Sequence, residues 1–363
     1  MFDVSVFEQI TYLNKIGDAK NDIERSYKQY LCQSLFVPKL HLVILNLIAA
    51  LIIFPIFIFL TFKRPFVKKR EEVKCIGEFP NRELNTIPDE LSRLMINNSV
   101  WTKNFSFQFS DWRYLFLLLK NYFISPFFVL KCGIKMAMYS HMIRLYHPST
   151  FVVMSEFSCT SSFLTLYCRD HNIRHINIMH GEKLFFIRDS FFHFDKCYVW
   201  DEHYKNLFLK LFAEPTQFVV SKPQYLKINV GKYQNKESYS DFKYYLSVFS
   251  EQELLSIINS LKFATQCGKT VKYRPHPRYS DLSLLRKYVK DQDIENPKDV
   301  SIEESISNLE YAVGSYTTVL LQAYSVGKKI INDDVTYKEQ YLKLKEMDYI
   351  LINKGLPSLS QFQ

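Results

Sequence analysis

From about residue 150 onward, short β-rich runs alternate with helical stretches, and this alternation limits the fold more than any other feature of the sequence. Alternating strands and helices form parallel sheets, because each strand returns to the same edge through a crossover helix. The polar stretch 229–241 interrupts the alternation once and is typical of a linker. The chain is therefore expected to be an α/β protein with two Rossmann-like domains. The β-rich runs are 151–154, 174–179, 197–200, 218–220, 244–249, 270–274, 311–313 and 329–331.

Residues 42–62 form an apolar run with only two polar side chains, long enough to cross a bilayer core of roughly 30 Å. The basic flank 63–70 would place the C-terminal side in the cytoplasm. Pro55 lies in the middle, so a spanning helix, a re-entrant hairpin and a buried core helix all stay open. The stretch 112–146 mixes basic and aromatic residues, which is typical of interfacial helices or of ordinary helices on a sheet.

The formal net charge of +9 favours an anionic partner. Asp and Glu are absent from Arg25 to Arg70 and again from Trp112 to Ser155. Both acid-free stretches are strongly apolar, which suits an anionic membrane surface better than a nucleic-acid groove. We therefore expect a membrane-associated N-terminal helical segment and no nucleic-acid partner.

The cysteine and glycine patterns exclude several classes of protein. The seven cysteines are scattered and show no CxxC spacing, so we expect reduced thiols and no zinc site. Glycine is scarce, and neither GxGxxG nor GxxxxGK[ST] occurs. We therefore expect no bound cofactor and no metal site.

One candidate binding element is Arg274-Pro275-His276-Pro277-Arg278, directly after a β-rich run. A strand end followed by two prolines holds one imidazole in a fixed place. The arginines add planar, permanently charged groups that suit phosphate. The alternative is a plain strand exit with a surface histidine.

A second candidate element begins where the run 311–313 ends. Gly314 is followed by Ser315, Thr317 and Thr318, on a turn or at the start of a helix. Hydroxyls and free N–H groups at a helix start bind anions, aided by the helix dipole. A simple helix cap is the alternative. Both elements occur in one α/β block at strand ends, and together they predict an anion site.

These two elements together resemble a pattern found in bacterial glycosyltransferases of the GT-B fold. Bacterial sialyltransferases carry a His-Pro element and, further along, a Ser/Thr pair. Capsule Kdo transferases have similar His-Pro elements, and teichoic-acid polymerases that use CDP-glycerol have a comparable arrangement. The matching residues here are His276-Pro277 with Thr317-Thr318, or Ser315 with Thr317. The resemblance covers roughly 242–335 and implies that these residues hold the phosphate of CMP or CDP.

The N-terminal block offers three candidates for a catalytic base. His180 and Gly181 follow the β-rich run 174–179 and look like the His-Gly element of teichoic-acid polymerases, whose histidine is the proposed base. The residues that normally surround that element are missing here, as is the acidic tripeptide of sialyltransferases. Glu182 would orient His180 or act as the base itself. Glu156, at a neighbouring strand end, is the third candidate, and a solvated loop position is its alternative.

The sequence thus predicts a metal-independent glycosyltransferase at the cytoplasmic face of the bacterial inner membrane. Its partners would be a nucleotide sugar, favoured as CMP-sialic acid or a related nonulosonate, and a glycan or lipid-linked glycan acceptor. A CDP-glycerol-type phosphotransferase, a UDP- or GDP-hexose transferase and a non-catalytic glycan-assembly scaffold are the alternatives. The expected division is 1–70 (N-terminal helix and membrane segment), 71–228 (acceptor domain) and 242–363 (nucleotide-sugar-binding domain).

Overall fold

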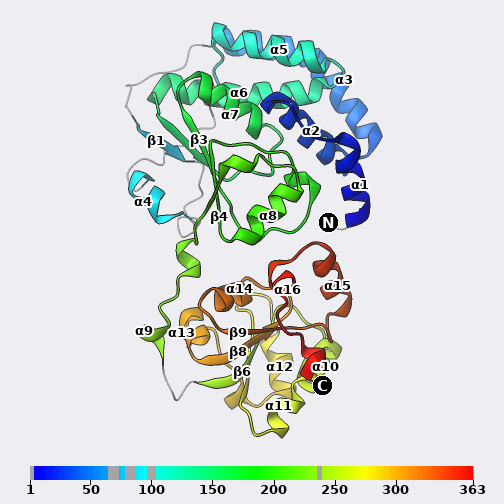
Figure 1. Cartoon of the computed structure of the whole chain (residues 1–363), viewed down its shortest axis with the longest axis vertical. Coiled ribbons are helices and arrows are strands. Elements are labelled where there is room, and N and C mark those ends of the chain that lie inside the picture. The colour runs from blue at the N-terminus through cyan, green and yellow to red at the C-terminus, as the bar shows by residue number, and fades with distance from the viewer. Residues whose placement is uncertain (1–3, 64–72, 78–86, 96–103, 235–238, 363) are drawn as a thin grey trace. The chain divides into compact units, whose positions relative to one another are not determined.

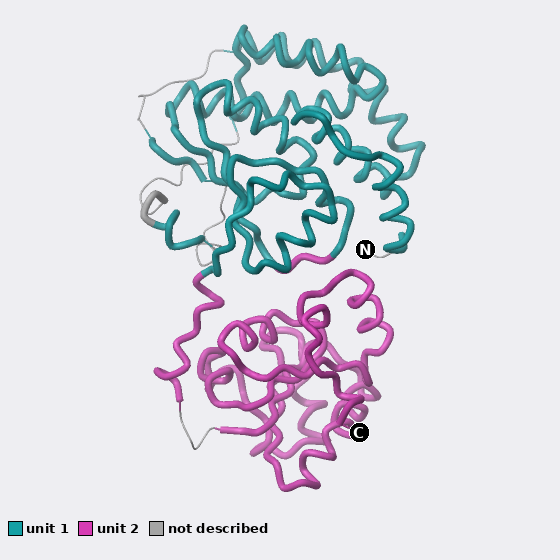
Figure 2. The backbone as a smooth tube through the Cα atoms, in the orientation of Figure 1, with its two compact units in different colours: residues 1–181, 185–223 teal, residues 182–184, 224–363 magenta. Residues whose placement is uncertain are grey.

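The chain forms two compact units (Figure 2). Each unit has its own parallel sheet. Unit 1 consists of Met1–Gly181 and Phe185–Pro223, and unit 2 of Glu182–Leu184 and Gln224–Gln363. Helices pack on both sheets, so the expected α/β class with two Rossmann-like units is confirmed. The computed structural model describes residues 4–63, 73–77, 87–95, 104–234 and 239–362.

The sheet of unit 1 has five parallel strands in the order of the chain: β1 (Cys75–Gly77), β2 (Thr150–Val153), β3 (Arg174–Ile178), β4 (Lys196–Val199) and β5 (Phe218–Val220). Side chains alternate between the two faces of the strands. Phe151 belongs to the large core under the long helices, whereas its neighbour Val152 packs in a smaller cluster on the other face. Because all five strands are parallel, their carboxyl ends meet at one edge.

The helices of unit 1 cover its sheet (Figure 1): α1 (Val6–Ile16), α2 (Asp22–Ser34), α3 (Lys39–Phe62), α4 (Asp89–Met95), α5 (Trp112–Tyr122), α6 (Pro126–Tyr146), α7 (Ser161–Asp170) and α8 (Glu202–Lys210). Helix α6 is buried along most of its length, because α3, α5 and α7 all pack on it. The described part of 1–70, which we expected to stand apart, therefore belongs to unit 1 and helps to form its core.

Helix α3 contains the apolar run, and one side of it is fixed to α6. Phe57 is fully buried, and a Cβ atom on Gly133 of α6 would lie 2.2 Å from its ring carbon Cζ. Both polar residues of the run have partners: Trp112 Nε1 donates to Thr61 Oγ1 at 3.1 Å, and Asn46 Oδ1 accepts a backbone N–H of α6 at 3.1 Å. In the described chain, α3 alone is long and apolar enough to cross a membrane. Its other side is exposed and apolar.

The sheet of unit 2 has four parallel strands, and the chain does not pass through them in spatial order. Strand β6 (Ser240–Tyr245) lies between β7 (Val271–Arg274) and β8 (Leu309–Gly314), and β9 (Lys329–Asn332) follows β8. The chain first leaves β6 toward β7 and then returns to the other side of β6. In such sheets ligands bind outside the carboxyl ends of the strands where the direction changes, which here means between β6 and β8.

The helices of unit 2 are α9 (Val230–Tyr233), α10 (Glu251–Ser260), α11 (Lys262–Gln266), α12 (Leu282–Tyr288), α13 (Ile302–Ser307), α14 (Thr318–Ser325), α15 (Lys338–Glu346) and α16 (Ile350–Asn353). For the site, α14 matters most, because it begins directly after the end of β8. Its first residues therefore lie at the edge of the sheet where a ligand is expected.

Candidate active site

A buried carboxylate and a partly exposed imidazole meet at the carboxyl ends of β2 and β3. The Oε1 atom of Glu156 lies 3.2 Å from Nδ1 of His180. The Glu156 side chain is 0% exposed and that of His180 is 34% exposed. A carboxylate beside Nδ1 favours a proton on that nitrogen and leaves Nε2 as the basic nitrogen. The two atoms are within ion-pair distance but are not aligned for a hydrogen bond, so the imidazole must rotate before Glu156 can orient it as a base.

The backbone around Glu156 is held from two sides. Asn177 of β3 donates from Nδ2 to Glu156 Oε2 at 3.0 Å and accepts the N–H of Ser155 at 2.8 Å. Gln29 of α2 donates to the carbonyl oxygen of Glu156 at 2.8 Å. The Phe157 ring meets the His180 ring edge-on, 5.5 Å between centroids. Neither Gln29 nor Asn177 was predicted from the sequence, although a polar residue inside the β-rich run 174–179 was a usable signal for Asn177.

The chain turns sharply after His180. Gly181 has a φ of +72°, in the left-handed region that favours glycine. Glu182, beyond this turn, is grouped with unit 2, and in this structure Glu156 rather than Glu182 is the partner of His180. Burial raises the pKa of Glu182 to about 7, and the nearby Tyr349 phenol offsets part of this rise. A carboxyl group with this pKa is suited to acid or base chemistry near neutral pH.

In unit 2 a cavity of about 180 Å³ lies where β6 and β8 end. Gly314 lets the ends of β6 and β8 lie close together, because a Cβ atom at this position would lie 3.3 Å from the carbonyl oxygen of Tyr245. Thr317 caps α14 by accepting the N–H of Val319 at 3.4 Å, and Thr318 is exposed in the first turn. The cavity is lined by Tyr244, Tyr245, Ser247, Val248, Ser315, Tyr316, Thr317, Tyr337 and Gln340.

His276 is held at the end of the neighbouring strand β7. Its Nδ1 accepts the N–H of Arg278 at 3.1 Å, so the neutral ring carries its proton on Nε2 and can donate from there. Burial and the Arg278 guanidinium lower the pKa of His276, which favours this neutral form. The backbone N–H of His276 donates to Ser280 Oγ at 2.8 Å, and that hydroxyl donates to the carbonyl oxygen of Ser247, which lines the cavity.

Arg274 ends β7 opposite Tyr245, which lines the cavity, but its guanidinium is paired with buried acceptors. It is buried, with Nη1 donating to Glu295 Oε1 at 2.8 Å and Nη2 donating to the carbonyl oxygen of Val300 at 2.9 Å. Lys243 contacts the same carboxylate. In this structure the Arg274 guanidinium is therefore engaged in a buried cluster with Glu295, and its role in phosphate binding stays a prediction.

Of the remaining predicted residues, Pro277 and Arg278 are exposed beside His276, and Ser315 Oγ donates to Gln340 Oε1 at 2.8 Å in the cavity wall. The structure thus groups His276, Ser315 and Thr317 around the ends of β6, β7 and β8.

One further sequence feature bears on the expected absence of a metal site. The chain contains one tripeptide of the Asp-x-Asp type that metal-dependent glycosyltransferases use, Asp291-Gln292-Asp293, in a turn after α12. The Asp291 carboxylate pairs with Arg286 at 2.9 Å. In the described part of the chain, no group of three or more His, Cys, Asp and Glu side chains is placed to hold a metal ion.

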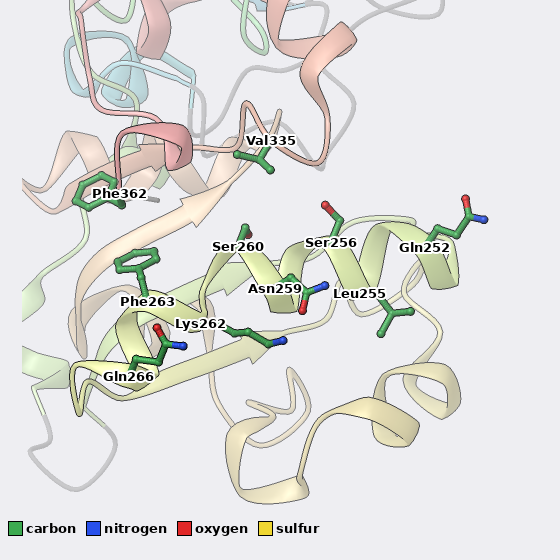
Figure 3. A pocket seen from close by; sticks show the side chains of 10 residues that line it. All are labelled: Gln252, Leu255, Ser256, Asn259, Ser260, Lys262, Phe263, Gln266, Val335 and Phe362. Atoms are coloured by element: carbon green, nitrogen blue, oxygen red, sulfur yellow. The ribbon is translucent and has the colours of Figure 1, made fainter.

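A larger hollow of about 810 Å³ runs along α10 and α11 (Figure 3). Its wall is formed by helix side chains such as Leu255 and Phe263, together with Val335 and Phe362, and Lys262 is its one charged lining residue. None of the predicted site residues lines it. We therefore place the candidate site at the strand ends and not in this hollow.

The chain matches no protein-family model and no curated protein. Three solved structures show a distant likeness. The glycotransferase of kitacinnamycin has 9% identity over 80% of this chain and 86% of that chain, with a TM-score of 0.43. UDP-GlcNAc 2-epimerase of Methanocaldococcus jannaschii, in complex with UDP-GlcNAc and UDP, has 13% identity over 59% and 68%, with a TM-score of 0.35. The wall teichoic acid polymerase TagF has 10% identity over 58% and 60%, with a TM-score of 0.35. We base the functional proposal on the site residues and not on these likenesses.

Proposed function

We propose that the protein is a glycosyltransferase that moves a sugar from a nucleotide donor to a hydroxyl of a glycan or lipid-linked glycan. The observation that carries this proposal is the buried Glu156 carboxylate 3.2 Å behind the partly exposed imidazole of His180. Such a pair is suited to removing a proton from a hydroxyl. The cavity at the strand ends of unit 2 meets the second requirement of the proposal, which is a place for the nucleotide phosphate.

In the proposed reaction, His180 Nε2 takes the proton of the acceptor hydroxyl as its oxygen bonds to the anomeric carbon. Glu156 stabilises the imidazolium that forms. The bond from the anomeric carbon to the donor phosphate oxygen breaks, and its electron pair leaves with the nucleotide. The Nε2–H of His276 and the hydroxyls of Thr317 and Thr318 offset the new negative charge on that phosphate. This scheme requires no metal ion.

For the donor we favour CMP-sialic acid or a related nonulosonate, because the His276-Pro277 and Thr317-Thr318 elements resemble those of bacterial sialyltransferases. The cavity of about 180 Å³ is below the roughly 300 Å³ at which ligand pockets usually begin. It suits the phosphate group, with the rest of the donor outside it. A CDP-glycerol-type phosphotransferase would use the same base, but its acceptor oxygen would attack phosphorus. A UDP- or GDP-hexose transferase would differ in the nucleotide.

We also propose that the protein works at the cytoplasmic face of the bacterial inner membrane, with α3 lying in the membrane surface. Helix α3 packs along the buried helix α6, so α3 could not span a bilayer without taking α6 with it. Neither α3, α5 nor α6 contains an acidic residue, which suits an anionic lipid surface. The exposed apolar side chains of this surface, the α3/α5 face, are Leu40, Val43, Ile44, Leu47, Ile48, Leu51, Phe54, Ile58, Phe59, Phe62, Phe116, Leu117, Phe123 and Ile124.

A thermal-shift panel of CMP, CDP, UDP and GDP tests the proposal. A ligand that binds only the folded protein adds about 2.7 kcal/mol of stability at a hundredfold excess over its Kd. We expect one cytidine nucleotide to raise the melting temperature strongly and the His276→Ala variant to lose most of that rise. No shift with any nucleotide would contradict the proposal and favour a non-catalytic scaffold.

A further inference from the structure

A second cavity lies in unit 1, next to the His180–Glu156 pair and outside the residues assigned so far. Its volume is about 530 Å³, within the usual range for small-molecule sites. Four segments of unit 1 form it: the end of α2 and the residues after it, α6, the loop after β2 and the loop after β3. The lining residues are Gln33, Phe36, Lys131, Phe157, Ser158, Cys159, Phe186 and Arg188.

Two residues, Phe157 and Gln29, contact both the cavity segments and the segments of the proposed base. Phe157 lines the cavity, and its ring also meets the ring of His180. Gln29, which is fully buried, donates both to the carbonyl oxygen of Glu156 at 2.8 Å and to that of Arg188 at 3.0 Å. A molecule bound in this cavity would therefore lie beside His180.

The charge of the lining is positive. Arg188 and Lys131 contribute the two charged side chains, and no acidic residue lines the cavity. The Nε atom of Arg188 donates to the buried Asp189 at 3.1 Å, whereas in the described chain its Nη1 and Nη2 atoms form no hydrogen bond. Its guanidinium lies 5.8 Å from the Phe157 ring centroid and 5.0 Å from that of Phe186. A planar fork held over two rings and a second cation together suit a phosphate group.

The remaining wall is aromatic. Phe36 and Phe186 pack together with ring centroids 4.9 Å apart, and Phe157 completes the apolar side. Phe36 also stands just before α3, whose outer side is the proposed membrane surface. An anionic headgroup with an apolar chain fits this combination of cations and rings better than a free sugar.

We infer that this cavity binds the acceptor through a phosphate or phosphodiester group, held by Arg188 and Lys131, with an apolar chain packed on Phe36, Phe157 and Phe186. The acceptor role rests on the proposed function. Binding of an apolar phosphate ester in the cavity does not rest on the proposed function, so the cavity assignment and the proposed function can fail separately.

Calorimetric titration of the full chain with three soluble probes tests the inference: inorganic phosphate, geranyl phosphate and geraniol. We expect geranyl phosphate to bind at least tenfold more tightly than either of the other two. Arg188→Gln and Lys131→Gln, which lie on different segments, should each raise the Kd for geranyl phosphate at least tenfold. Arg174→Gln, an exposed arginine at the start of β3, is the matched control and should leave this Kd unchanged.

Equal binding of inorganic phosphate and geranyl phosphate would overturn the apolar part and point to a free phosphorylated acceptor. An unchanged Kd in both Arg188→Gln and Lys131→Gln, with melting temperatures near wild type, would overturn the inference as a whole. If both variants lose geranyl phosphate while no nucleotide binds the protein, the cavity stands and the proposed function fails. If sugar transfer proceeds with a normal acceptor KM in both variants, the proposed function stands and the cavity assignment fails.

Discussion

The Nδ1 atom of His180 lies 3.2 Å from the carboxylate of Glu156, which is completely buried behind it. The two residues are contributed by neighbouring strands, β2 and β3, whose register places both strand ends at one edge of the sheet. In the proposed reaction Glu156 is a positioning residue, because it contacts the His180 imidazole and does not contact the substrate itself.

Glu156→Gln should lower turnover by roughly 10² or more, because the imidazolium loses its negative partner. Donor affinity should stay at the wild-type value, since a base acts on the rate and not on donor binding. Steady-state kinetics with a melting-temperature control would measure this. His147→Asn, an exposed histidine outside the site, serves as the matched variant. Unchanged turnover in Glu156→Gln would show that His180 works without this carboxylate.

His276→Ala should weaken binding of the preferred nucleotide at least tenfold while the melting temperature stays near that of the wild type. A hydrogen bond to a charged group contributes about 1.5–3 kcal/mol, and the Nε2–H of His276 is the donor that would be lost. Calorimetric titration gives the Kd directly. A Kd within twofold of wild type would remove His276 from the phosphate site.

Arg274→Ala, in contrast to His276→Ala, should lower the stability of the protein and leave nucleotide affinity unchanged. It leaves the buried Glu295 with Lys243 as its remaining cationic partner, so the free energy of unfolding should fall by about 2 kcal/mol or more. The nucleotide Kd of the molecules that remain folded should not change. Denaturant unfolding and calorimetry together measure both quantities. A large loss of affinity with normal stability would return Arg274 to the phosphate site.

Membrane association should depend on the outer side of α3. Leu51 is 77% exposed and Phe59 is 65% exposed, so replacing both with lysine removes apolar area without disturbing the core. We expect the Leu51→Lys/Phe59→Lys protein to lose binding to anionic vesicles in a flotation assay and to keep its melting temperature. Phe57→Lys is the contrasting variant, because that side chain is fully buried and its replacement should unfold unit 1. Full-length wild-type protein that stays soluble without detergent and ignores vesicles would contradict the membrane proposal.

Unit 1 should lose stability in mild acid. His175 is buried between Tyr139 and Thr165, and burial lowers its pKa to about 3. The unfolded chain binds this proton near pH 6.5, so the stabilisation is present above that pH and is lost progressively as the pH falls toward 3. The single group accounts for about 2 kcal/mol between pH 8 and pH 5. Urea unfolding of wild type and His175→Gln at both pH values measures it, and an equal pH dependence in the two proteins would refute the assignment.

The sequence was sufficient to predict strands with uninterrupted β-rich runs, such as β2, β3 and β8. Strand β6 was expected at 244–249 but spans Ser240–Tyr245, because the buried Lys243 pairs with Glu295 and breaks the apolar pattern. Strand β1 was not predicted, because its three residues are too few to show the pattern of a strand. The sequence of 251–267 predicts one helix, whereas the structure has two helices, α10 and α11, separated at Leu261.

The positions of the candidate residues at strand ends were predictable from the sequence, but their contacts with one another were not. His180 and Glu156 were each expected at strand ends, whereas their contact depends on the register of β2 and β3 and on Asn177 between them. The pairing of Arg274 with Glu295 was not predictable, because the two residues lie 21 positions apart and nothing in the local pattern marks Glu295.

The central claim is that His180 activates a hydroxyl for attack on a nucleotide-bound sugar. The most direct measurement is the rate of nucleotide release from saturating donor, with water as the acceptor, for wild type and His180→Ala. We predict measurable hydrolysis by the wild type, a rate lower by roughly 10²–10⁴ in His180→Ala, and the same donor Kd in both proteins. Equal rates in the two proteins, or no hydrolysis of any nucleotide sugar by the wild type, would contradict the account.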